Sequence, residues 1–83
     1  MSRFLIVSPH LHEECTRAFK EVVNAGYATH FDWGCADGDH TGWVILDAEN
    51  AKEALMVVPS FLRTKARAVK LTKINAKGEL VGS

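Results

Sequence analysis

The sequence predicts an α+β fold in which a four-stranded antiparallel sheet carries two helices on one face. Three observations predict it. A short apolar run near the N-terminus is followed by a clean amphipathic helix pattern. An Asp-Gly pair then separates two further apolar runs, which is typical of a hairpin. A helix-capping sequence and a lysine-bearing apolar run complete a second strand–helix–strand pattern.

The N-terminal part of the chain predicts a strand and a helix. Residues 3–8 (RFLIVS) are apolar on both faces, which indicates a central strand covered on two sides. From residue 11 to residue 23 the apolar residues recur at helical spacing, and Gly26 is a plausible helix stop. The apolar stripe of this helix consists of Leu11, Cys15, Ala18, Phe19, Val22 and Val23. We therefore expect Cys15 to be a core residue.

Two further strands are predicted at residues 27–35 and 40–48, joined by a tight turn. A type I′ turn with Asp37-Gly38 at its centre would place Cys35 directly opposite His40. A turn centred one residue later would change this partner but would leave the two faces of the hairpin the same. In either case the apolar face that carries Cys35 and His40 is expected to lie under the helices.

The C-terminal part predicts a short helix and an edge strand. Asn50 and Glu53 resemble a capping box for a helix that Pro59 ends. Residues 66–74 alternate imperfectly and carry lysines, as an edge strand does. The chain is thus one domain over residues 1–75 with a loose C-terminal tail over 76–83.

The composition indicates a small soluble protein. No run of about 18 apolar residues is present to span a membrane, and the N-terminus lacks a signal-peptide pattern. Two cysteines without a C-x-x-C motif favour a reducing compartment, so the cytoplasm is expected. The basic C-terminal segment has no nucleic-acid-binding motif. A chain of 83 residues buries only about 60–65% of its unfolded surface, which favours a homodimer.

The element order is that of the ferredoxin-like βαββαβ sandwich, with sheet order 4-1-3-2. In that topology the end of the first strand, the tip of the hairpin and the start of the fourth strand meet at one end of the sheet. Polar and ligand-forming residues therefore gather there: His10, His12, Cys35, Asp37, Asp39, His40, Arg63, Lys65 and Arg67. We expect this end to carry the function.

Four interpretations of this end stay open. His10, Cys35 and His40 are suitable ligands for a transition metal such as zinc, copper or nickel. Alternatively, the domain is a small enzyme in which Cys35 acts with His40 or His10 in nucleophilic or acid–base chemistry. A small anionic or organic ligand is a third interpretation, and a structural or regulatory dimer without a ligand is the fourth. The candidate residues for the third are His10, His12, Asp39, Arg63 and Arg67.

Several sequence blocks resemble a group of short bacterial stand-alone proteins in the dimeric α/β-barrel superfamily. These blocks are Ser8-Pro9-His10, residues 31–35 (FDWGC), residues 38–41 (GDHT), residues 59–63 (PSFLR) and residues 65–67 (KAR). The resemblance covers about residues 3–74. It implies two ferredoxin-like sheets that pair face to face, and it brings no catalytic motif that can be transferred residue by residue.

Overall fold

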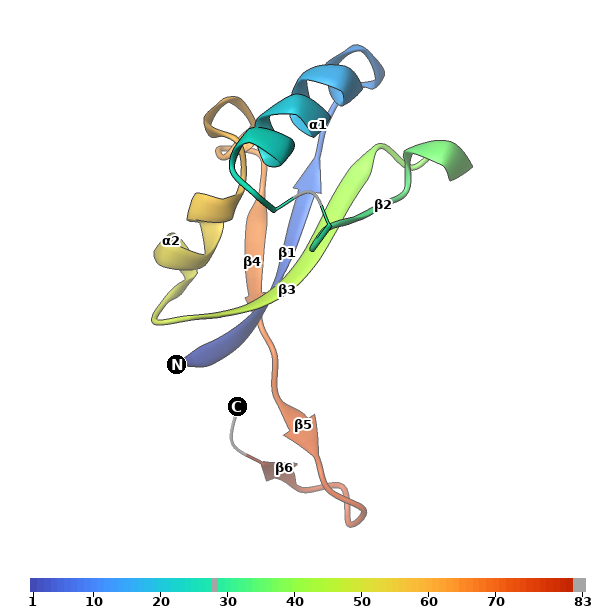
Figure 1. Cartoon of the computed structure of the whole chain (residues 1–83). Helices are drawn as coiled ribbons and strands as arrows, with labels where there is room; N and C mark the ends of the chain where they lie inside the picture. The colour runs from blue at the N-terminus through green and yellow to red at the C-terminus, as the bar shows by residue number, and fades with distance from the viewer. Residues whose placement is uncertain (28, 82–83) are drawn as a thin grey trace.

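The computed structural model describes residues 1–27 and 29–81 and confirms the α+β class with a four-stranded antiparallel sheet and two helices (Figure 1). The sheet order is β2-β3-β1-β4, which reads 4-1-3-2 from the β4 edge. In chain order the strands of this sheet and the two helices are β1 (Ser2–Pro9), α1 (Cys15–Asn24), β2 (Asp32–Trp33), β3 (Thr41–Ala48), α2 (Ala51–Ala54) and β4 (Arg67–Lys70).

The core lies between the two helices and one face of the sheet. Along β1 the side chains alternate, so that Phe4 and Ile6 are buried while Leu5 and Val7 are half-buried. Core residues come from both helices, both central strands and the segments around them: Phe4, Ile6, Ala18, Val22, Phe31, Val44, Ala48, Ala54, Val57, Val58 and Leu62. The prediction that β1 is a central strand is confirmed. Both helices pack on one face of the sheet, as predicted, and a cover over the second side of β1 stays a prediction.

The hairpin between β2 and β3 differs from the predicted one. Strand β2 has only two residues, whose register pairs Asp32 with Trp43. The chain then forms a 3₁₀ turn over Cys35–Asp37 that ends at Gly38, whose φ is +85°. A type I′ turn would also need a positive φ at Asp37, and no non-glycine residue of the described chain has one. The two-residue turn is therefore wrong, although the faces of the hairpin are as predicted.

The second helix begins as predicted and ends early. The Asn50 side chain accepts a hydrogen bond of 2.8 Å from the N–H of Glu53. After one α-helical turn the chain tightens to a 3₁₀ turn at Leu55–Val57. Val58 is then extended, as expected for a residue that precedes a proline. A second 3₁₀ turn, Ser60–Leu62, places Leu62 in the core.

The predicted last strand over 66–74 is divided in the structure. Strand β4 ends at Lys70, and β5 (Lys73–Ile74) pairs instead with β6 (Leu80–Val81). The expected loose tail is thus a hairpin as far as residue 81, while the end of the predicted tail lies outside the described residues. None of the helices in the described part of the chain has the length and apolar character needed to cross a membrane.

Candidate metal centre

Four side chains with metal-binding atoms converge at one end of the sheet. His10 follows β1, Cys15 begins α1, Cys35 begins the 3₁₀ turn after β2, and His40 precedes β3. The ligand atoms of these four residues all lie within 4.8 Å of one another. The structure therefore brings the three predicted ligands together. It adds Cys15, which is half-buried in this cluster rather than a core residue.

The separations inside the cluster approach those of a tetrahedral metal site. His10 Nε2 lies 3.1 Å from the Sγ of Cys15 and 3.2 Å from the Sγ of Cys35. The two sulfur atoms are 3.7 Å apart, and His40 Nδ1 is 3.3 Å from the Sγ of Cys15. Bonds of about 2.3 Å to sulfur and about 2.0–2.1 Å to nitrogen in a tetrahedron require S···S and S···N separations of about 3.8 and 3.6 Å. These four separations differ from the required ones by a few tenths of an ångström, whereas a pair of ligand atoms at the 4.8 Å limit of the cluster would need to approach by about 1 Å.

Hydrogen bonds in the β1–α1 connection position the first two ligands. The backbone N–H of His10 donates to the carbonyl oxygen of His40 at 2.9 Å, which ties the two histidines together. The Glu14 carboxylate accepts a bond of 2.8 Å from the N–H of Leu11 and pairs with Lys65 at 3.2 Å. The bond from Leu11, assisted by Lys65, holds the pKa of Glu14 below its ordinary value. These bonds hold the β1–α1 connection in a compact turn that places Cys15 beside His10.

The connection between β2 and β3 presents the other two ligands from its two ends. The Gly34 carbonyl oxygen accepts hydrogen bonds from the N–H groups of Asp37 and Asp39, each at 3.0 Å. A Cβ atom on Gly34 would lie 2.6 Å from the carbonyl oxygen of Asp39, so the tight approach requires glycine. This compact turn brings Cys35 and His40 to the same side.

The protonation of the cluster without metal follows from burial. Burial and, after it, the neighbouring His40 lower the pKa of His10 below its ordinary value. Burial raises the pKa of the Cys35 thiol, and the neighbouring Cys15 raises it further. At neutral pH His10 is therefore a neutral imidazole ready to bind a metal, whereas a metal must displace the proton of Cys35. A nucleophilic cysteine at neutral pH needs the opposite shift of its pKa.

His12 lies outside the four-residue cluster but touches it. Its Nδ1 is 3.4 Å from the Nε2 of His40, and the two rings meet edge to face with centroids 5.0 Å apart. Since His40 faces Cys15 with Nδ1, its second nitrogen is free to hydrogen-bond to His12. Such outer contacts fix the tautomer and orientation of a metal-binding imidazole.

The other predicted ligand-binding residues lie outside the four-residue cluster. Asp39 accepts a hydrogen bond of 2.7 Å from the Thr41 hydroxyl. The Arg63 guanidinium donates to the carbonyl oxygen of Val58 at 2.9 Å. Arg67 lies on β4 opposite Val7. The structure places none of the three in the four-residue cluster, and their role in binding an anion stays a prediction.

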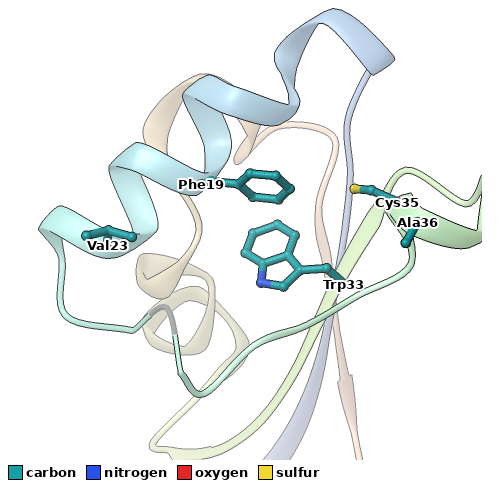
Figure 2. A pocket seen from close by; sticks show the side chains of 5 residues that line it. All are labelled: Phe19, Val23, Trp33, Cys35 and Ala36. Atoms are coloured by element: carbon teal, nitrogen blue, oxygen red, sulfur yellow. The ribbon is translucent and has the colours of Figure 1, made fainter.

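An apolar pocket of about 460 Å³ borders the cluster on the side of Cys35 (Figure 2). Its main wall is Trp33, which meets the edge of Phe19 at a centroid distance of 4.8 Å and stacks on Phe31 at 5.3 Å. The ring of Trp33 packs against Gly42, where a Cβ would lie 2.9 Å from it, so a larger residue at this position would clash with the ring. The pocket is completed by Val23 and Ala36. The sulfur of Cys35 thus has apolar surroundings on one side, which fits its raised pKa.

Cys15 is the candidate ligand that the sequence interpretation missed. Its position on the apolar stripe of α1 gave it the role of a core residue, which is the usual role of a free cysteine. A signal was present, however, in the mirrored spacing of the four residues: His10 and Cys15 are separated by four residues, and so are Cys35 and His40. Two such pairs on two neighbouring connections form a complete set of four ligands.

Comparison with protein-family models, curated proteins and solved structures finds no match to this chain. The interpretation of the site therefore depends on its geometry. The relationship to the dimeric α/β-barrel superfamily stays a prediction.

Proposed function

We propose that this chain is a zinc-binding protein in which His10, Cys15, Cys35 and His40 hold one metal ion. The observation that carries this proposal is the convergence of their four ligand atoms within 4.8 Å of one another. The chemistry of the set supports zinc, because two thiolates and two imidazoles in a tetrahedron are a preferred environment for Zn²⁺.

The donor count favours a structural role for the metal over a catalytic one. Catalytic zinc sites use three protein ligands and keep one position for water or substrate, whereas structural sites are closed by four. The ligands come from two connections, between β1 and α1 and between β2 and β3, which are far apart in the sequence. A bound ion would therefore fasten the start of α1 to the end of the sheet. A fastening of this kind is valuable in a small domain, whose core supplies little stability.

Metal analysis of the purified full-length chain tests the proposal. The protein is produced without a histidine tag and measured by elemental mass spectrometry. We expect one zinc per chain, and loss of the metal in Cys15→Ser and Cys35→Ser. His30→Ala is the matched control, because His30 is an exposed histidine outside the cluster. Protein that contains no metal and takes up neither Zn²⁺ nor Co²⁺ would overturn the proposal.

A further inference from the structure

The C-terminal hairpin of β5 and β6 extends beyond the end of the main sheet (Figure 1). We call residues 73–81 the arm. Its turn is well ordered by Asn75, whose side chain accepts hydrogen bonds from the N–H groups of Lys77 and Glu79 at 2.9 and 3.0 Å. Gly78 supplies the positive φ of +81° that the turn requires. The arm is thus a defined hairpin that projects from the body.

The apolar side chains of the arm are uncovered. Ile74 and Leu80 pair across the hairpin and are 65% and 76% exposed, and Val81 is 40% exposed. A two-stranded hairpin by itself is marginally stable in water, and it has no core in which to bury such residues. An arm of this composition is suited to burial against another surface.

A groove with an acidic rim lies at the same end of the sheet. Ser2 pairs with Ala48 and Phe4 pairs with Lys70. The last residues of β3 and β4 therefore lie at the same end of the sheet, and the arm follows β4 there. The groove has a volume of about 370 Å³. Its apolar lining includes Leu46, Val57 and the 62% exposed Met56, and its acidic residues are Asp47 and Glu53.

The arm and the groove have complementary charges. The arm and the residue from which it departs carry Lys70, Lys73 and Lys77 against the single acid Glu79. The groove offers two carboxylates, Asp47 and Glu53. Within the described residues the ion pairs are Arg17–Glu21 and Lys65–Glu14, so none of these groups is paired inside its own chain.

We propose that the arm of one copy docks into the groove of a second copy, and that the exchange is reciprocal in a two-fold homodimer. One chain carries both complementary surfaces, which is what a two-fold interface requires.

The open face of the sheet is the competing surface for a dimer. Its large aromatic residue Trp43 packs against Gly34, with ring atoms 2.9 Å from where a Cβ would be, and is half-buried within its own chain. Among the apolar residues of that face, Ile45 is the exposed one, at 58%.

The test measures the mass of the full-length protein by sedimentation at several concentrations. We expect twice the 9.2 kDa of one chain. Leu80→Asp is expected to yield monomers, and it should fold because Leu80 is exposed within its own chain. Ile45→Asp on the open sheet face is the matched control and is expected to stay dimeric, with circular dichroism confirming the fold of both variants.

A charge exchange tests the docking partner. Asp47→Lys with Glu53→Lys, and separately Lys73→Glu with Lys77→Glu, are each expected to weaken the dimer by about tenfold or more, and combining all four is expected to restore it. A wild-type protein that is monomeric at every concentration would overturn the proposal. So would a dimer that survives Leu80→Asp and is lost in Ile45→Asp, since that result assigns the interface to the open sheet face.

Discussion

Removal of zinc is expected to lower the melting temperature of this domain by a large amount. The ion would link two connections, whose sulfur and imidazole nitrogen atoms lie 3.1–3.3 Å apart and have only weak contacts to one another without it. Free zinc at about 1,000 times its Kd stabilises the folded state by about 4 kcal/mol. For a domain of 60–100 residues each kcal/mol shifts the melting temperature by about 4–8 °C, which predicts a difference of about 15–30 °C.

The assay is thermal unfolding followed by circular dichroism, in matched zinc-loaded and chelator-treated samples. Cys15→Ser removes one of the four ligands, so zinc is expected to stabilise this variant by less than half as much as the wild type. His30→Ala is expected to respond to zinc as the wild type does. A chelator that leaves the melting temperature of the wild type unchanged would refute the reasoning that the ion fastens these connections.

Three further predictions follow from the surroundings of the site. His12→Ala is expected to weaken zinc binding by about tenfold in competition with a chromophoric chelator, and an unchanged affinity would deny the contact with His40 any role. Gly34→Ala brings a Cβ within 2.6 Å of the Asp39 carbonyl oxygen, so urea unfolding should show a loss of about 1–3 kcal/mol; a loss within error would mean that the turn relaxes freely. The pKa of His10 is depressed from its ordinary value of 6.5, so the unfolded state binds the extra proton more readily and metal-free protein loses stability as the pH falls below 6.5. His10→Asn should flatten that dependence in urea unfolding between pH 7 and pH 5, and an equal slope in both proteins would contradict it.

The sequence was sufficient to predict the class of the fold and the end of the sheet where the site lies. The helical spacing of α1 and the cap at Asn50 are local signals. The cap gave the start of α2, whereas α1 begins at Cys15 and not at residue 11, where the helical spacing begins. The juxtaposition of His10, Cys35 and His40 followed from topology, because the order of the elements brings their connections to the same end of the sheet. These predictions depended only on the spacing of residues along the sequence and on the order of the elements.

The predictions that failed depended on short-range geometry that a pattern does not contain. The early exit of the chain from β2 follows from Gly34, whose carbonyl oxygen accepts two N–H groups of the next turn. The shortening of α2 reflects the extended backbone of Val58 before Pro59. Cys15 has the spacing of a core residue, yet at the first position of α1 it lies at the open end of the helix, where its sulfur reaches the other ligands. The conformation of the preceding turn decides how buried a residue at a helix terminus is. Here the hydrogen bond from the N–H of Leu11 to the Glu14 carboxylate fixes that turn.

X-ray absorption spectroscopy at the zinc edge on the metal-loaded, full-length chain tests the central claim most directly. The account predicts two sulfur ligands at about 2.3 Å and two nitrogen ligands at about 2.0–2.1 Å, with one sulfur lost in Cys15→Ser. A coordination shell of oxygen and nitrogen alone, unchanged by that substitution, would contradict the assignment of His10, Cys15, Cys35 and His40 as the metal site.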